Sequence, residues 1–235
     1  MQFARPGFDI GLFSNQRDAQ LGFWQQTVGL AFDHLGKLGG GLQQHRHVLG
    51  DAVLKMNHAR DPLPGQPAGG LAAVHVFAAD AAEGADLKDP DGNRVLRWPS
   101  AAGAGARYAM TLRSPDPARL AAFYRDVLGF TELAPPTTAP EGARCLAHGA
   151  GRIFVTTAGA DWMACPDWRG PGYRYLTLQV MSARDAWAEA LAGGATEGEG
   201  LRELGELVRF GFIRDPDGNW LELSERTTFT GRPLT

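Results

Sequence analysis

The stretch Phe212-Ile213-Arg214-Asp215-Pro216-Asp217-Gly218-Asn219-Trp220-Leu221-Glu222-Leu223 decides the fold of this chain. It predicts a strand, a tight turn and a second strand. Pro216 presets a turn backbone angle, Asp217 can bond its own backbone, and Gly218-Asn219 tolerate a positive φ. The same five-residue turn occurs in residues 87–96, again between strand-like segments. We interpret the two turns as an internal repeat.

Alternation after the turn singles out one carboxylate. Leu221 and Leu223 share one face of the strand, and Glu222 points to the other. A carboxylate that alternates with buried leucines is expected to face solvent, a partner charge or a metal. Glu222 is therefore the first candidate functional residue.

This pattern resembles the vicinal-oxygen-chelate (VOC) superfamily, the group of glyoxalase I, extradiol ring-cleaving dioxygenases and bleomycin-resistance proteins. Residues 120–130, Leu-Ala-Ala-Phe-Tyr-Arg-Asp-Val-Leu-Gly-Phe, are similar to the helix that follows the first strand of a family module. The resemblance implies an α+β fold of βαβββ modules, with curved mixed sheets around a cavity and helices outside. It does not fix the chemistry, because the superfamily hosts many reactions and some pure binders.

Composition limits the class of protein. The chain has 235 residues, 44% of them hydrophobic and 21% charged, with a net charge of -3. That charge offers no basic surface, so neither nucleic acid nor an anionic membrane is an expected partner. The start of the chain lacks a signal-peptide pattern, and no apolar stretch is long enough to span a bilayer. These features predict a soluble, cytoplasmic protein.

Periodicity predicts four modules in two tandem domains. Residues 1–98 form the first domain, 99–106 a small-residue linker, and 107–235 the second domain. The first module is complete, with strands at 8–14, 32–38, 42–49 and 52–58 and a helix at 18–28. The second is degenerate, with a strand at 71–77 and a hairpin ending at residue 98. The third and fourth have helices at 117–127 and 183–191, and their strands cover 108–112, 131–133, 143–148, 152–157, 173–180, 201–207, 208–214 and 220–224.

The resemblance also implies where a divalent metal would bind. In metal-dependent relatives, His and Glu ligands come from the first and last strands of paired modules, and the ion acts as a Lewis acid. Glu222 matches the last-strand position, but Tyr175 stands where the fourth module should offer a histidine. Val155 or Thr156 replaces the carboxylate of the third module. One carboxylate cannot hold a selective metal site, so we expect this site to be lost, with Glu222 a catalytic base or a salt-bridged remnant.

A second group of polar residues lies on two neighbouring strands of the first module. Lys55 and Asn57 alternate with apolar residues and are expected to face the cavity. On the adjacent strand either Gln43, His45 and His47 or the pair Gln44 and Arg46 face it. His45 and His47, two residues apart, could ligate a metal or act as acid and base near neutral pH. An exposed polar sheet would explain these residues equally well.

The fourth module adds three further candidates. Tyr175 and Gln179 alternate onto the face predicted for Glu222, where a tyrosine hydroxyl beside a carboxylate would form a proton-transfer pair. Arg209 could pair with Glu222 or with a substrate carboxylate. His75, in the second module, is more typical of a structural histidine than of a ligand.

These observations predict a small-molecule enzyme of lyase or isomerase type that moves a proton next to a carbonyl. Its catalytic candidates are Glu222, Tyr175, His45 and His47, and its substrate-binding candidates are Lys55, Asn57, Gln179 and Arg209. One divalent metal on Glu222 or on His45 and His47 is the only cofactor considered. The alternatives are a non-catalytic binder like the antibiotic-sequestering relatives and, third, an iron-dependent extradiol dioxygenase. A homodimer follows from analogy with the family.

Overall fold

The computed structural model describes residues 1–234, and its elements follow the order of four modules. The first module comprises β1 (Asp9–Ser14), α1 (Arg17–Gly22), η1 (Phe23–Thr27), β2 (Phe32–Gly39), β3 (Leu42–Leu49) and β4 (Ala52–Ala59). The second is shortened, as predicted, to β5 (Leu71–Ala78), β6 (Ala85–Lys88) and β7 (Arg94–Pro99), followed by η2 (Ser100–Gly103). The third comprises β8 (Tyr108–Ser114), α2 (Pro117–Ala122), η3 (Phe123–Val127), β9 (Thr131–Leu133), β10 (Arg144–His148) and β11 (Gly151–Thr157). The fourth comprises β12 (Gly172–Gln179), α3 (Ala183–Ala192), β13 (Thr196–Leu204), β14 (Val208–Arg214) and β15 (Trp220–Arg226), followed by α4 (Thr227–Thr230).

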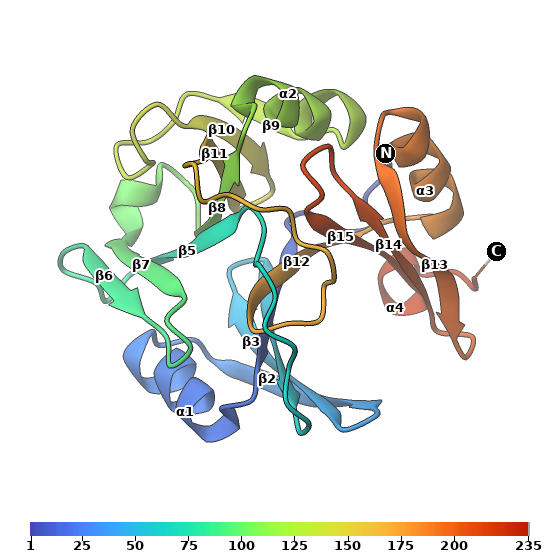
Figure 1. Ribbon diagram of the computed structural model, residues 1–235, viewed down its shortest axis with the longest axis horizontal. Coiled ribbons are helices and arrows are strands. Elements are labelled where there is room, and N and C mark those ends of the chain that lie inside the picture. Colours follow the sequence, from blue (N-terminus) through green and yellow to red (C-terminus); the bar gives the residue numbers. More distant parts are fainter. Residues whose placement is uncertain (235) are drawn as a thin grey trace.

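The strands form two mixed sheets with the helices at the periphery (Figure 1). The eight-stranded sheet has the order β13-β14-β15-β12-β1-β4-β3-β2, and the seven-stranded sheet has the order β6-β7-β5-β8-β11-β10-β9. Antiparallel pairing of β1 with β12 joins the first and fourth modules. Pairing of β5 with β8 joins the second and third in the same way.

The sheets therefore cross the expected boundary at 99–106, because each contains strands from both sides of it. Other contacts link neighbouring modules along the chain. Gln20 of α1 donates to Asp89 in the turn of the second module, at 3.0 Å. Tyr124 of η3 donates to Asp215 in the turn of the fourth, at 3.2 Å. The division of the chain into two tandem domains stays a prediction, whereas the sharing of each sheet is a property of the fold.

The repeated turn has the same hydrogen bonds in both copies. Asp215 Oδ1 accepts from the backbone N–H groups of Asp217 and Asn219, at 3.0 and 2.9 Å. Asp89 makes the equivalent bonds in the second module. The expectation that Asp217 would bond its own backbone is wrong, since the first aspartate of the turn does so. Gly218 has φ +81°, as the turn requires.

The first module's helix and α3 pack on the eight-stranded sheet, whereas α2 packs on β8, β10 and β11 of the seven-stranded sheet. Trp24 and Val28 of the first module are buried in one core with Leu54 and Met56 of β4. We call this side of the sheet the helix face. The predicted helices at 18–28 and 117–127 are present, and each ends in a π-helical turn, η1 and η3. Within residues 1–234 none of the helices has the length and apolar character needed to cross a lipid bilayer.

The largest difference from the predicted strand boundaries is at β13. The strand expected at 201–207 is β13, which spans Thr196–Leu204. Residues 205–207 instead form the turn into β14, where Gly205 has φ +57°. A glycine adopts this left-handed conformation without the steric cost that other residues meet, and it therefore ends the strand.

Candidate functional site

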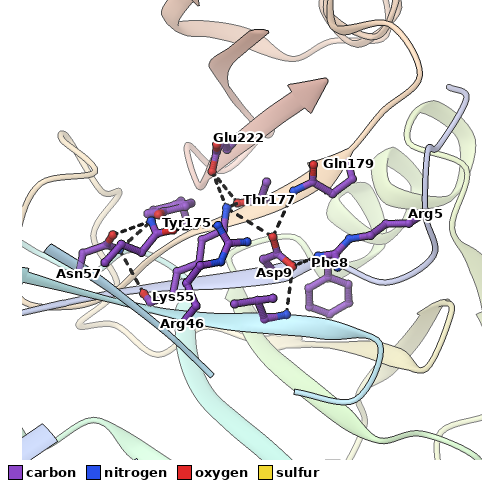
Figure 2. Close-up of polar contacts among 12 residues, drawn as sticks. Arg5, Phe8, Asp9, Arg46, Lys55, Asn57, Tyr175, Thr177, Gln179 and Glu222 are labelled. Carbon is purple, nitrogen blue, oxygen red and sulfur yellow. Dashed lines mark hydrogen bonds and ion pairs between the residues drawn. The ribbon is translucent and has the colours of Figure 1, made fainter. Parts of the chain in front are cut away.

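The four central strands of the eight-stranded sheet each contribute one side chain to a buried polar cluster (Figure 2). These side chains are Asp9 of β1, Lys55 of β4, Thr177 of β12 and Glu222 of β15. The strand register brings them level, because Thr177 is the Cα partner of both Asp9 and Glu222. We call the side of the sheet that carries them the lysine face.

Lys55 lies at the centre of this cluster. Its Nζ is 2.9 Å from Glu222 Oε2, 2.6 Å from Thr177 Oγ1 and 3.4 Å from Asp9 Oδ2. The side chain is 1% exposed. Burial lowers the pKa of the Lys55 ammonium, while Glu222 and Asp9 act in the opposite direction. Two carboxylates beside one buried ammonium favour the charged lysine.

The two carboxylates have different environments. Asp9 is fully buried, and its Oδ1 accepts from the backbone N–H of Val53 and from Arg5, while its Oδ2 accepts from Gln179. Glu222 Oε2 accepts from Lys55 and from Thr177, the latter at 2.6 Å. Glu222 Oε1 accepts no hydrogen bond from any residue in 1–234, and the side chain is 10% exposed. Glu222 thus has one fixed oxygen and one available oxygen.

A directed chain of hydrogen bonds ends at Tyr175. Arg46 donates to Gln44 Oε1 at 3.2 Å, Gln44 donates to Asn57 Oδ1 at 2.9 Å, and Asn57 donates to the Tyr175 hydroxyl oxygen at 3.2 Å. Because that oxygen accepts from Asn57, its own hydrogen is free to point elsewhere. Burial raises the pKa of Tyr175 well above its usual value, and the Glu222 charge adds to the shift. The hydroxyl is therefore a proton-holding donor on the lysine face.

An aromatic cluster covers the Tyr175 side of this face. Trp168, from the loop before β12, stacks on Phe212 with ring centroids 4.8 Å apart. The same indole makes edge contacts with Phe13 and Tyr175. Trp168 is fixed by its own hydrogen bond to Glu199, at 2.9 Å. The loop thereby shields the tyrosine from water.

The two histidines lie on the other side of the sheet. His45 and His47 are the Cα partners of Met56 and Leu54, so they share the helix face with these residues. His47 contacts Gln25 of η1 at 3.2 Å, and burial lowers its pKa to about 4. Of the two alternatives for β3, Gln44 and Arg46 face the cluster. The sheet separates His45 and His47 from Glu222.

Arg209 is also placed away from the cluster. It pairs with Glu203 at 2.7 Å and with Glu225 at 3.4 Å. Its Cα partner is Glu225, three residues after Glu222 in β15 and therefore on the opposite side of the sheet, so the Arg209 side chain points to the helix face. The residues that the fold brings together are therefore Glu222, Tyr175, Lys55, Asn57 and Gln179.

Sequence reasoning missed Asp9, Thr177, Arg46 and Gln44 as members of this group or left them as alternatives. A signal was present for two of them. Asp9 interrupts an apolar strand, and Thr177 lies between Tyr175 and Gln179 in the same alternating series. The pairing of β1 with β12, which joins them, has no local signal.

The donor set does not fit a resident divalent metal. Structural and catalytic metal sites use at least three nitrogen, oxygen or sulfur ligands, and a protonated lysine has no lone pair to offer. Here Lys55 occupies the space between Asp9 and Glu222. Across residues 1–234 there is no group of three or more His, Cys, Asp or Glu residues that could hold an ion. Neither Glu222 nor the pair His45 and His47 has the partners that the metal hypothesis required.

The seven-stranded sheet has a separate cavity of about 820 Å³. Thr111 lines it and contacts His75 Nε2 at 2.8 Å, while Trp98 Nε1 donates to His75 Nδ1 at 3.2 Å. An indole N–H can only donate, so Nε2 of the neutral His75 carries the proton and donates to Thr111. The Thr111 hydroxyl hydrogen is then free to donate into the cavity. His75 is a buried histidine with partners on both nitrogens, as the sequence suggested.

Comparison with known proteins places this geometry in a family. Residues 106–223 match the sequence profile of the Glyoxalase/Bleomycin resistance protein/Dioxygenase superfamily. A search of curated proteins found no match. Glyoxalase I from Zea mays is similar in structure, with a TM-score of 0.74, 12% identity and coverage of 96% of this chain and 95% of that one.

Two further solved structures are similar to the chain. A putative dioxygenase from Bacillus subtilis subsp. subtilis str. 168 has a TM-score of 0.65 at 12% identity, covering 100% of this chain and 92% of its own. An antibiotic binding protein from Streptomyces sp. CB03234 covers 50% of this chain and 93% of its own at 19% identity, and its TM-score of 0.39 is too low to support an argument. At these identities the likeness concerns the fold alone.

Proposed function

The chain belongs to the Glyoxalase/Bleomycin resistance protein/Dioxygenase superfamily, and on that premise we propose that it is a small-molecule enzyme of lyase or isomerase type. The reaction moves a proton next to a carbonyl group of a small oxygenated metabolite. One observation carries the proposal. Glu222 has one oxygen fixed by Lys55 and Thr177 and one available oxygen, on the same face as the Tyr175 hydroxyl.

Each residue has a defined task in this proposal. Glu222 Oε1 takes the proton from the carbon next to the carbonyl, which leaves an enolate, and then returns a proton to that enolate. Tyr175 donates a hydrogen bond to the carbonyl oxygen as negative charge develops there. Lys55 holds Glu222 in a buried ion pair, and its Nζ, 5.6 Å from the centre of the Tyr175 ring, adds positive charge near that ring. Asn57 orients Tyr175, and Gln179 orients Asp9.

Proton exchange tests this function without a known substrate. A panel of small 2-hydroxyketones and 2-hydroxyaldehydes is incubated with the protein in D2O, and loss of the C–H signal is followed by proton NMR. We expect the wild-type chain to catalyse exchange on at least one compound and Glu222→Gln to lower the rate by about 10²- to 10⁴-fold. Glu206→Gln, on an exposed glutamate of the same module, is the matched control and should leave the rate unchanged. Equal rates in the wild type and Glu222→Gln would refute the role of Glu222.

A second candidate function is ligand capture without turnover. The cavity over the seven-stranded sheet supports it, because about 820 Å³ lies within the range of small-molecule sites. The same panel, extended to aromatic antibiotics, is screened by saturation-transfer NMR. Binding that Thr111→Val weakens, without any exchange chemistry, would favour a binder over an enzyme.

The iron-dependent dioxygenase hypothesis has less support. It requires two histidines beside Glu222, whereas Glu222 contacts Lys55 and Thr177. His45 and His47 lie on the opposite face of the sheet. A small-molecule ligand and a homodimer remain the partners that we propose. Light scattering distinguishes a particle of 25.2 kDa, the mass of one chain, from one of twice that mass.

A further inference from the structure

We propose that the ammonium group of Lys55 is a tethered substitute for a divalent cation, and that removing it turns the space between Asp9 and Glu222 into a metal site. The inference concerns the same cluster as the proposed function, but it is a statement about cation binding and does not depend on any activity. It also explains why a superfamily fold has a donor set that does not fit a metal.

The three oxygens converge on one point from three different strands. Asp9 Oδ2, Thr177 Oγ1 and Glu222 Oε2 lie 3.4, 2.6 and 2.9 Å from Lys55 Nζ. Hydrogen-bonded register between β1, β12 and β15 fixes their positions. Lys55 enters from a fourth strand, β4, which pairs with β1 through its backbone, and a change of side chain at residue 55 keeps this backbone pairing. A shorter side chain at residue 55 therefore leaves the oxygens where they are.

The two carboxylates favour a cation at the position of Lys55 Nζ. Asp9 is fully buried and Glu222 nearly so, and buried carboxylates without a partner charge are strongly unfavourable. Arg5 contacts Asp9, but through its other oxygen, Oδ1. Without the lysine, Glu222 Oε2 retains only the neutral Thr177 hydroxyl as a hydrogen-bond partner, and the charge of Arg226 acts on Glu222 and Asp9 without a hydrogen bond to either. Two carboxylates and a hydroxyl are hard oxygen donors, which suit Mg²⁺, Ca²⁺ or Mn²⁺.

Manganese is a direct probe, because the electron paramagnetic resonance signal of free Mn²⁺ reports its binding. Three proteins are compared: the wild-type chain, Lys55→Glu, which adds a third carboxylate, and Lys55→Met, which only removes the charge. We expect no binding by the wild type and one Mn²⁺ per chain in Lys55→Glu, with a dissociation constant of about 10 to 100 μM. Lys55→Met should bind at least about tenfold more weakly than Lys55→Glu, since it lacks one anionic ligand.

Two controls identify the site. Lys37→Glu places a carboxylate at an exposed position of β2 and should bind no Mn²⁺. Adding Glu222→Gln to Lys55→Glu should weaken binding by at least about tenfold, because it removes an anionic ligand. Near-UV circular dichroism, with and without Mn²⁺, reports whether each variant is folded.

Several outcomes would overturn the inference. Stoichiometric Mn²⁺ binding by the wild type, abolished by Glu222→Gln, would mean that the lysine does not exclude a metal. A folded Lys55→Glu that binds no Mn²⁺ would mean that the oxygens cannot ligate an ion. If neither Lys55 variant folds in the presence of Mn²⁺, the inference also fails, because the ion should replace the lost charge. None of these measurements detects catalysis, so the proposed enzyme function can fail or succeed independently.

Discussion

Lys55 and Glu222 are 167 residues apart in the chain, yet Lys55 Nζ lies 2.9 Å from Glu222 Oε2. Their strands, β4 and β15, are not neighbours, because β1 and β12 lie between them. The ion pair therefore spans the seam where the first and fourth modules meet. Gly11 of β1 lies beside Lys55 in the register and has no side chain to obstruct this crossing.

Removing the lysine charge should destabilise the protein strongly. Lys55→Met keeps much of the side-chain volume but leaves the buried Glu222 without its ion-pair partner and Asp9 with Arg5 alone, and we expect a loss of about 3 to 5 kcal/mol in the free energy of unfolding. Urea denaturation measures it. Lys37→Met, at an exposed position, is the control and should change stability by less than about 0.5 kcal/mol. Equal effects of the two substitutions would show that Lys55 is not holding the cluster together.

Gly11→Ala should disturb Tyr175. A Cβ atom at Gly11 would collide with the ring of Tyr175, a side chain that is almost completely buried. We expect a loss of about 1 to 3 kcal/mol, the usual cost of overpacking. In the double variant Gly11→Ala/Tyr175→Ala the collision is absent, so its cost should be lower than the sum of the two single effects. If urea denaturation shows that the cost of the double variant equals the sum of the two single costs, the predicted collision between residue 11 and the Tyr175 ring does not occur.

His75 should make stability depend on pH. Burial lowers its pKa from 6.5 to about 4, with the charge of Arg94 adding to the shift. Below pH 6.5 the unfolded chain therefore takes up a proton that the folded chain refuses, and the free energy of unfolding falls as pH drops toward 4. The full stabilisation is present above pH 6.5, and about 3 kcal/mol is lost over this window.

Urea denaturation of the wild type and His75→Gln at pH 7 and pH 4.5 measures this linkage. The variant should lose less stability on acidification than the wild type, by about 2 to 3 kcal/mol. An NMR titration in which the His75 ring protonates near its usual pKa would show that burial does not perturb it.

The repeated turn should be equally sensitive in its two copies. Gly92 and Gly218 have φ of +85° and +81°, and a Cβ atom at either position meets no close neighbour. Alanine there should cost about 1 to 2 kcal/mol through backbone strain alone. Gly22, in a helical conformation with free space around it, is the matched control. Gly22→Ala should instead stabilise the protein, by about 0.5 to 1 kcal/mol. Thermal unfolding of the three variants measures these changes in stability. If Gly218→Ala leaves the stability unchanged, the positive φ at this position does not require a glycine.

Local sequence patterns were sufficient to predict most helices and strands. They also predicted two of the four cluster residues, Lys55 and Glu222. The DPDGN turns, the helical stripe at 18–28 and the alternation of Leu221, Glu222 and Leu223 are short-range signals, and the corresponding elements are present. The same alternation predicted that Lys55 and Asn57 share a face opposite Leu54 and Met56, and this is confirmed.

Long-range pairing could not be predicted from these patterns. Nothing in the strand 8–14 indicates that its partner is residue 172 onward rather than the second module. The faces of β3 were ambiguous because both alternating sets, His45 with His47 and Gln44 with Arg46, are polar. The pairing of β1 with β12 places Asp9 beside Thr177, and the pairing of β3 with β4 places the histidines on the helix face.

The pairing of β1 with β12 also determines when, during synthesis, β1 gains its second partner strand. As the chain leaves the ribosome, β1 can pair with β4 as soon as the first module is complete, but its other edge stays unpaired until the second and third modules and the strand β12 have been made. Until β12 emerges, β1 is an unprotected strand edge on a nascent chain, of the kind that chaperones shield and that aggregates otherwise recruit. A messenger truncated before the fourth module would therefore yield an aggregation-prone fragment. Asp9 and Lys55 would be solvent-exposed in it, and the fragment would lack Thr177 and Glu222 of the cluster.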